Sequence, residues 1–292
     1  MTFLSDTTVA HLKDVAAWPE FTSDRYLVRD MIGRGGMGAV YAAHDSALGR
    51  DVAIKVGARL TGEAQMLARL EHPGIVPVHD YGVLADGRPF YVMKRVDGQT
   101  LAALLRGAPP LAERLRIFER VCEAVSFAHS RGVIHRDLTP ANIMIGSFGE
   151  VMVMDFGVAS LLAVDSEPGV VLGTRGFMPP EQAAAGGADA VDERADVYAL
   201  GAVLDAMLDD GSPAPLRSIA QRAMNDAREA RYASVTVLGD DVRRFRTGDA
   251  VQAHGEGPLE RAARFGRKYH VPILLVLAYI VMRALIAFFS GV

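Results

Sequence analysis

Cysteine is nearly absent from this chain of 292 residues, which contains a single one, Cys122. One cysteine excludes an internal disulfide and any zinc site built from several cysteines, and it fits a reducing compartment. The stretch "IFERVCEAVSFAH" around Cys122 has apolar residues at helical spacing. We therefore expect Cys122 to be buried and inert rather than reactive.

The chain also lacks a surplus of positive charge, since its formal net charge is −4. A protein that binds nucleic acid by neutralising phosphates needs a basic surface, so we expect no nucleic-acid partner. Hydrophobic residues make up 50% of the chain and charged residues 23%. A chain of this length and composition can bury a core, as one large domain or as two smaller lobes.

A signal peptide is absent, because "MTFLSDTTVAHLKD" has neither a basic start nor an apolar core of sufficient length. We therefore expect the N-terminus to lie in the cytoplasm. Long apolar runs are absent until residues 271–289, "VPILLVLAYIVMRALIAFF". A helix over these 19 residues is about 28 Å long, which is close to the thickness of the hydrocarbon core of a bilayer.

Positive charges precede this run at Arg261, Arg264, Arg267 and Lys268, which marks that side as cytoplasmic. Arg283 argues against a span, because an arginine at the centre of a membrane helix costs about 2.5 to 3.5 kcal/mol. The many Leu, Ile, Val and Phe residues offset part of that cost. We predict a single-pass membrane helix over residues 271–289 after a basic linker over residues 249–270. The alternative is an amphipathic or partner-binding helix.

The remaining chain changes from strand patterns to helix patterns. The runs "RYLVRDMIG", "GAVYAAHD" and "RDVAIKV" are short, rich in β-branched residues and separated by turn residues, which is typical of consecutive antiparallel strands. From Leu111 onward apolar residues recur at helical spacing, and Gly132 is placed to end that helix. These patterns predict an α+β protein with two lobes and a cleft between them.

A glycine-rich stretch lies within the first strands. Gly33, Gly35 and Gly38 in "GRGGMGAVY" have the GxGxxG spacing, which dinucleotide-binding domains also use. There the glycines open a helix, whereas here the chain continues as a strand, so we expect a hairpin turn whose amides bind phosphates. Lys55 ends the strand "VAIK" and is expected to face the same phosphates. The alternatives are a hairpin without a ligand and a solvated edge charge.

Three polar residues suit phosphoryl transfer. Asp137 and Asn142 lie five residues apart in "HRDLTPAN", and Asp155 opens "DFG". The reaction needs an acceptor for the proton of the substrate hydroxyl, oxygen ligands for magnesium and cations for the phosphates. Aspartate and asparagine in loops are commonly turn formers, which is the alternative. The ordered succession of four motifs argues against coincidence, because each match constrains the others.

From about Arg25 to Gly248 the chain resembles the eukaryotic-like Ser/Thr protein kinases of bacteria, most clearly in "GRGGMGAVY", "EHPGIVPVHDYG" and "GTRGFMPPEQA". The resemblance implies a two-lobed kinase fold, with an N-lobe over residues 25–93 and a C-lobe over residues 97–248. It implies ATP and Mg²⁺, or Mn²⁺, as cofactors. Asp137 would accept the proton, while Asn142 and Asp155 would bind the metal.

The resemblance also implies a nucleotide site. Lys55 would hold the α- and β-phosphates and pair with a helix glutamate, Met93 would be the gatekeeper before the hinge, and Asp97 would reach the ribose. The implied ATP-binding residues are Ile32, Gly33, Gly35, Gly38, Val40, Ala53, Lys55, Met93, Val96 and Asp97. Structural roles are implied for Glu181, which would pair with Arg231, and for Asp196, which would anchor the catalytic loop.

Two positions depart from the family pattern. Thr139 stands where the family has a lysine that contacts the γ-phosphate, and the loss of one such contact costs about 10² in rate. The hydroxyl of Thr139 is expected to hold Asp137 in place. Glu63 is the expected partner of Lys55 because helical apolar spacing follows it, but only seven residues separate the two, so its helix should be short. Glu63 is otherwise an ordinary first-turn acid.

An activation segment from Asp155 to Glu181 favours a protein substrate over a small molecule, and Pro140 favours Ser/Thr over Tyr. Phosphorylation sites are expected at Ser166 or Thr174, with self-association for autophosphorylation and Arg136 as the phosphate ligand. We therefore predict a membrane-anchored Ser/Thr kinase with a leader over residues 1–24 and a cytoplasmic kinase domain. The alternative is a nucleotide-binding pseudokinase that serves as a membrane-tethered scaffold.

Overall fold

The computed structural model describes residues 18–21, 24–35, 38–57, 60–156, 174, 176–183 and 192–290. The strands are β1 (Tyr26–Gly35), β2 (Gly38–Asp45), β3 (Arg50–Val56), β4 (Val78–Val83), β5 (Pro89–Lys94), β6 (Gly98–Thr100), β7 (Ile143–Gly146) and β8 (Val151–Val153). The α-helices are α2 (Thr61–Leu67), α3 (Leu101–Arg106), α4 (Leu111–Ser130), α6 (Pro180–Ala183), α7 (Arg194–Met207), α8 (Ala214–Ala223), α9 (Val235–Thr247), α10 (Pro258–Lys268) and α11 (His270–Ser290). Short 3₁₀ helices are η1 (Pro140–Asn142) and η3 (Arg228–Ala230).

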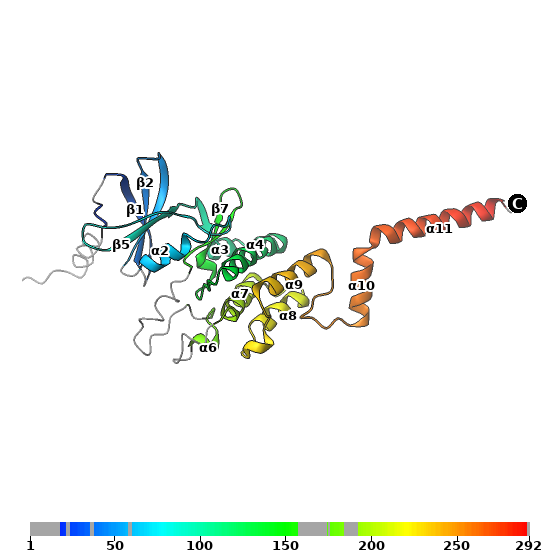
Figure 1. Ribbon diagram of the computed structural model, residues 1–292. Helices are drawn as coiled ribbons and strands as arrows, with labels where there is room; N and C mark the ends of the chain where they lie inside the picture. The colour runs from blue at the N-terminus through cyan, green and yellow to red at the C-terminus, as the bar shows by residue number, and fades with distance from the viewer. Residues whose placement is uncertain are drawn as a thin grey trace, which may run out of the picture.

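The strand-rich N-lobe is one antiparallel sheet of five strands in the order β1-β2-β3-β5-β4, accompanied by α2 (Figure 1). Alternate residues along a strand face opposite sides of a sheet. On β3, Val52 and Ile54 therefore pack into the core on the outer face, while Ala53 packs into the core shared with the C-lobe. Lys55 follows Ala53 by two positions and so lies on the same side of the sheet.

The outer face of the sheet is covered by residues just before β1, which had no assignment from sequence. The ring of Trp18 packs edge-on against Tyr41 with centroids 5.5 Å apart, and Phe21 packs against Phe90 at 4.8 Å. The amide of Ala85 donates a hydrogen bond to the carbonyl of Glu20 at 3.3 Å. The end of the predicted leader therefore packs against the N-lobe.

The helical C-lobe is built around α4, whose buried face matches the predicted spacing. Phe118, Val121 and Cys122 are among its buried residues, and burial raises the pKa of the Cys122 thiol, as expected for an inert cysteine. Gly132 follows the helix with φ of 73°, and its amide bonds the carbonyl of His129 at 2.8 Å. The predicted stop is therefore confirmed, because glycine adopts this left-handed conformation without strain.

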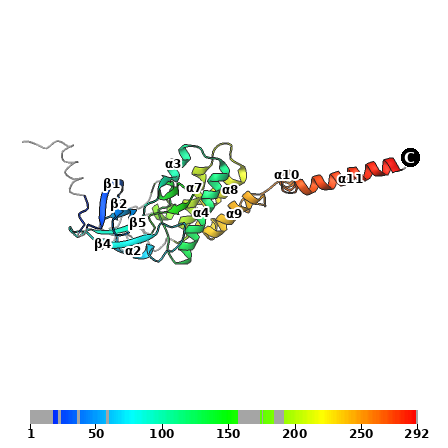
Figure 2. The ribbon, with the colours of Figure 1, turned by 90° about the horizontal axis from the view of Figure 1, so that it is seen from above.

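The chain beyond α9 first folds back onto the C-lobe. The carboxylate of Asp241 accepts hydrogen bonds from the amides of Gln252 (2.6 Å) and Ala253 (3.0 Å) and from the hydroxyl of Tyr232 (2.8 Å). The predicted basic linker then contains a helix, α10, and the predicted apolar helix lies within α11. Both helices project away from the kinase-like body (Figures 1 and 2).

Within the described residues, no helix taken singly has the length and apolar character needed to cross a membrane. Pro258–Gly266 and His270–Ile286, which are bent by 75° relative to each other, satisfy that criterion only as a pair.

Candidate active site

Lys55 joins the two lobes through two carboxylates. Its Nζ donates to Glu63 Oε1 at 2.9 Å and to Asp155 Oδ1 at 2.8 Å, and the predicted pairing with Glu63 is therefore present. Lys55 is 5% exposed and Glu63 1% exposed. Burial lowers the pKa of Lys55, but the charges of Asp155 and Glu63 outweigh burial, so the net shift is upward and the ammonium stays charged.

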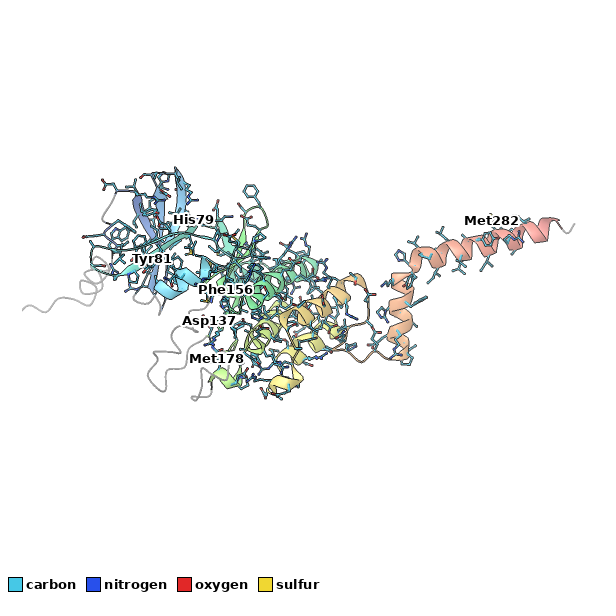
Figure 3. The ribbon with its side chains drawn as sticks, viewed as in Figure 1. His79, Tyr81, Asp137, Phe156, Met178 and Met282 are labelled. Atoms are coloured by element: carbon cyan, nitrogen blue, oxygen red, sulfur yellow. The ribbon has the colours of Figure 1, made fainter. Side chains whose placement is uncertain are left out.

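Asp155 begins the activation segment in a conformation that is uncommon for residues other than glycine, with φ of 58°. The next residue, Phe156, is fully buried, and its ring lies 4.7 Å from that of His135. Asp137 and Phe156 both lie where the N-lobe meets the helices of the C-lobe (Figure 3). Burial of Phe156 thus directs the carboxylate of Asp155 toward Lys55.

The catalytic loop is anchored by Asp196 of α7, as predicted. Its carboxylate accepts hydrogen bonds from the amides of His135 and Arg136, both at 2.8 Å, and from Nε2 of His129 at 2.7 Å. Burial alone raises the pKa of Asp196, but the hydrogen bond and charge of His129 and the amide of His135 outweigh it and lower the pKa. The ionised carboxylate therefore holds the loop that carries Asp137.

Asp137 is held by Thr174 and Asn142. The amide and the hydroxyl of Thr174 both donate to Asp137 Oδ1 at 3.2 Å, and Asn142 Nδ2 donates to the Asp137 carbonyl at 2.8 Å and to Oδ2 at 3.3 Å. Among the described residues the hydroxyl that bonds Asp137 belongs to Thr174, and the bond expected from Thr139 is not present. Thr139 itself is 4% exposed and precedes η1 in an extended conformation.

Asn142 and Asp155 supply oxygen atoms suited to magnesium. The amide of Met154, which precedes Asp155, bonds the Asn142 carbonyl at 2.9 Å and ties the two loops together. Asn142 uses its Nδ2 on Asp137, and Asp155 uses Oδ1 on Lys55. Among the described residues, one side-chain oxygen of each is therefore left for a hard cation. Within the described residues, no cluster of three or more His, Cys, Asp or Glu side chains could hold a metal ion.

The glycine loop is a hairpin rather than the start of a helix, because Gly35 on β1 pairs with Gly38 on β2. Gly38 has φ of 140°, and a Cβ at this position would lie 2.1 Å from the carbonyl oxygen of Val56. No other residue fits there without displacing the backbone of β3. The prediction of a glycine hairpin is therefore confirmed, although residues 36–37 at its tip lie outside the described residues.

The other residues of the predicted nucleotide site follow from the sheet register. Val40 lies opposite Lys55, and Ala53 lies opposite Met93, so their side chains share the face that carries Lys55. Val96 packs against the core after β5. Gly33 on β1 pairs with Val40 on β2, whereas Ile32 and Asp97 are exposed. Val40, Ala53 and Met93 are thus placed together on the face that carries Lys55.

The end of the activation segment is fixed by a buried ion pair. Arg231 NH1 donates to Glu181 Oε1 at 2.6 Å, and NH2 donates to Oε2 at 2.8 Å. The predicted pair is therefore present as a bidentate ion pair. Gln182 Nε2 donates to the carbonyl of Arg136 at 2.8 Å and connects α6 to the catalytic loop. The predicted phosphorylation site Ser166 lies outside the described residues.

Sequence reasoning missed Tyr91. Its hydroxyl donates a hydrogen bond to Glu63 Oε1 at 2.8 Å, and the residue is fully buried on β5. The run "FYVM" is typical of a buried strand, and only the alternation along β5 could have placed Tyr91 on the same face as Met93.

The fold and this site define a protein kinase. The family model for the protein kinase domain matches residues 26–246. Serine/threonine-protein kinase PknB of Mycobacterium leprae is 41% identical over 214 residues, which are 67% of this chain and 34% of PknB. The DNA damage-responsive serine/threonine-protein kinase RqkA of Deinococcus radiodurans is 43% identical over 196 residues, 62% of this chain and 29% of RqkA.

Among solved structures, the PknI kinase domain of Mycobacterium tuberculosis matches with a TM-score of 0.61 and 28% identity, over 78% of this chain and 98% of that domain. The chain belongs to the eukaryotic-like Ser/Thr protein kinase family of bacteria, and its kinase domain is of the ATP-dependent class. The chain spans about a third of the length of the curated relatives it matches.

Proposed function

We propose that the chain is an active protein kinase that transfers the γ-phosphate of ATP to serine and threonine hydroxyls of proteins. One observation carries this proposal: Lys55 bonds Glu63 and Asp155 at the same time, at 2.9 Å and 2.8 Å. Catalysis of phosphoryl transfer rests mainly on positioning and electrostatics. The two contacts hold the Lys55 ammonium in one position between the lobes, which supports a role for it in binding the phosphates of ATP.

Asp137 orients the substrate hydroxyl and accepts its proton. The two hydrogen bonds from Thr174 engage Oδ1, and the shorter bond from Asn142 goes to the backbone carbonyl of Asp137. The carboxylate is therefore fixed in direction, and among the described residues Oδ2 accepts only the longer contact of 3.3 Å from Asn142. A general base must lie within hydrogen-bond reach of the proton it takes, which fits this arrangement.

Asn142 and Asp155 would hold Mg²⁺, and Mn²⁺ would suit the same oxygen ligands. A divalent cation bound there would supply positive charge to the β- and γ-phosphates. Asp155 keeps its direction through Lys55, which lies 2.8 Å away, and Asn142 keeps its direction through Asp137. The contacts of Lys55 with Asp155 and of Asn142 with Asp137 thus hold both the proposed cation ligands and the proposed base in place.

Adenine would lie against Val40, Ala53 and Met93, which share the face of the sheet that carries Lys55. Gly33, Gly35 and Gly38 would bring backbone amides to the phosphates, with Ile32 covering the base and Val96 following in the hinge. The exposed Asp97 would bond the ribose. The match of apolar residues to the base and of glycines to the phosphates supports ATP as the phosphate donor.

Regulation would occur through autophosphorylation between two copies of the chain. Ser166 is the proposed acceptor, with Arg136 as the phosphate ligand. Thr174 is the weaker candidate, because its hydroxyl already donates to Asp137 at 3.2 Å. Intact-mass analysis after incubation with ATP would reveal a phosphate that is lost in Ser166→Ala. An unchanged mass on the unaltered chain would remove this part of the proposal.

The chain would be anchored in the cell membrane by α11, with the kinase domain in the cytoplasm. Support comes from its length of 21 residues and from large apolar side chains that are mostly exposed, including Leu274 (61%), Leu275 (67%) and Val276 (57%). Two charges of α10 pair with carboxylates in the segment between α9 and α10, Arg264 with Glu256 at 2.8 Å and Lys268 with Asp249. The basic helix would therefore hold the domain near the lipid surface.

The second candidate function is a nucleotide-binding pseudokinase that acts as a scaffold, and Thr139 is the observation that favours it. A threonine provides no positive charge for the γ-phosphate. The experiment that separates the two functions is phosphoamino-acid analysis of an acceptor protein incubated with the chain, ATP and Mg²⁺. We expect phosphoserine and phosphothreonine from the unaltered chain and neither from Asp137→Asn. Nucleotide binding without either product would favour the scaffold.

A further inference from the structure

Helix α2 is too short to fix Glu63 by itself. It has seven residues, its N-cap residue Leu60 makes no side-chain capping bond, and Glu63 lies in its first turn. Isolated helices of fewer than about 12 residues are marginal in water, so the position of Glu63 depends on tertiary contacts. Leu60, Ala64 and Leu67 are buried and attach the helix to the core, but apolar contacts have no direction.

Directional contacts come from two neighbouring strands. Lys55 on β3 lies directly opposite Tyr91 on β5, so both side chains leave the same face of the sheet. Glu63 Oε1 accepts a hydrogen bond from each, at 2.9 Å from Lys55 Nζ and 2.8 Å from the Tyr91 hydroxyl. Glu63 Oε2 is buried and has no hydrogen-bond partner among the described residues. The carboxylate is therefore located by two donors on a single oxygen.

The hydroxyl of Tyr91 stays protonated and can therefore donate a hydrogen bond. Burial, with the negative charges of Glu63 and Asp155, raises the pKa of Tyr91 well above its ordinary value. Burial also raises the pKa of Glu63 and outweighs the charge of Lys55 and the hydrogen bond from Tyr91, which both lower it. The hydroxyl thus favours the charged carboxylate, which is the form that pairs with Lys55.

We propose that Tyr91 is a positioning residue for phosphoryl transfer, whose hydroxyl holds Glu63 in place and through it orients Lys55. The hydroxyl supplies a fixed contact that the short α2 does not provide. This inference rests on the proposed kinase function, since it concerns the lysine that meets the phosphates. In this role Tyr91 acts through Glu63 rather than on the substrate.

The test uses Tyr91→Phe in the full chain, because phenylalanine keeps the ring and removes only the hydroxyl. The matched control is Tyr26→Phe, since the hydroxyl of Tyr26 also donates to a carboxylate, Asp80, at 2.5 Å, but in the outer core of the N-lobe. Hydrogen bonds to charged groups are strong enough that we expect kcat/KM to fall about tenfold in Tyr91→Phe. We expect less than a twofold change in Tyr26→Phe.

The pH profile separates positioning from packing. Loss of the donor raises the pKa of Glu63, so the acid limb of kcat/KM should move to higher pH in Tyr91→Phe and stay in place in Tyr26→Phe. A double-mutant cycle adds a second check. In a Glu63→Gln background, Tyr91→Phe should change kcat/KM less than twofold. An equal loss in both backgrounds would overturn the proposal, because the hydroxyl would then act elsewhere.

A readout without activity keeps the proposal testable if the chain transfers no phosphate. Carbon-13 NMR of the glutamate carboxyl carbons, with Glu63→Gln for assignment, gives the titration midpoint of Glu63. The midpoint should rise in Tyr91→Phe and not in Tyr26→Phe, with thermal unfolding confirming that both variants are folded. An unchanged midpoint in Tyr91→Phe would overturn the positioning role, whereas an inactive unaltered chain with a shifted midpoint would overturn only the proposed function.

Discussion

At the scale of single residues, Asp196 fixes the catalytic loop. It is fully buried, and it accepts hydrogen bonds from two backbone amides and from His129 at 2.7 to 2.8 Å. A buried carboxylate is costly unless such donors satisfy it. The loop around Asp137 therefore depends on the charge of a residue that takes no part in the chemistry.

This charge makes the contribution of Asp196 depend on pH. Its folded-state pKa lies below the ordinary value of 3.8, so its stabilisation is present above about pH 3.8 and is lost as pH falls through the folded pKa. We expect Asp196→Asn to lower the free energy of unfolding by about 3 kcal/mol at neutral pH, since hydrogen bonds to a charged group are lost. Urea unfolding over a pH series should show the difference shrinking in acid. A difference independent of pH would contradict this account.

The sequence was informative for individual side chains where a motif supplies the chemistry. Lys55, Glu63, Asp155 and the loop of Asp137 come together as predicted, although their catalytic roles remain proposals. Contacts outside the motifs were not predictable. Tyr91 and Glu63 lie 28 residues apart in the sequence. Their hydrogen bond depends on the register of β3 and β5 and on the position of α2 against the sheet.

At the scale of secondary-structure elements, the pair of Glu181 and Arg231 joins α6 to the chain before α9. Arg231 is 3% exposed and also donates to backbone carbonyls, including that of Asn225 at 2.7 Å. Burial raises the pKa of Glu181, but the hydrogen bond from Arg231 outweighs it and lowers the pKa, so both partners are charged. The pair thus fixes the end of the activation segment to the C-lobe.

Removal of one partner should be severe. We expect Glu181→Ala to lower the free energy of unfolding by about 3 to 5 kcal/mol, because it leaves a buried guanidinium without its counter-charge. Arg228→Ala is a matched control, since its pair with Asp192 is more exposed and should contribute about 1 kcal/mol or less. Denaturant unfolding of both variants measures the difference. Similar losses of unfolding free energy in the two variants would show that burial of the Glu181–Arg231 pair does not make its removal more costly.

Elements with regular patterns were predictable, and those that depend on short signals were less so. The apolar spacing of α4 and its stop at Gly132 were predicted, as was the brevity of α2. The helix α10 was missed because its basic residues were taken for a linker. Pro258 at its first position and Glu260, which bonds the Gly257 amide at 3.0 Å, are the start signals that could have revealed it.

At the scale of the whole molecule, a strand-rich lobe, a helical lobe and two projecting helices follow one another along the chain (Figure 2). The two lobes were predictable from the change in periodicity. The direction of α11 was not, because a bend of 75° between helices depends on the few residues where they meet. The lobes meet through Lys55 and Asp155. Met282 on α11 lies far from Asp137 and Phe156, which mark the region between the lobes (Figure 3).

The anchor proposal predicts a difference between the full chain and residues 1–270. In vesicles containing anionic lipid, the full chain should stay with the lipid after an alkaline carbonate wash, because a spanning helix is inserted effectively irreversibly. Residues 1–270 should dissociate at high salt, since only charge would hold them. Release of the full chain by the wash would contradict a span and favour an interfacial or partner-binding helix.

The most direct test of the account is the rate of phosphate transfer from labelled ATP by the full chain, beside Asp137→Asn and Thr139→Lys. We predict measurable transfer by the unaltered chain, loss in Asp137→Asn, and a rate up to about 10² higher in Thr139→Lys, because a cation near the γ-phosphate would be restored. No transfer by the unaltered chain, despite nucleotide binding, would contradict the proposal of an active kinase. Recovery in Thr139→Lys would then place the defect at Thr139.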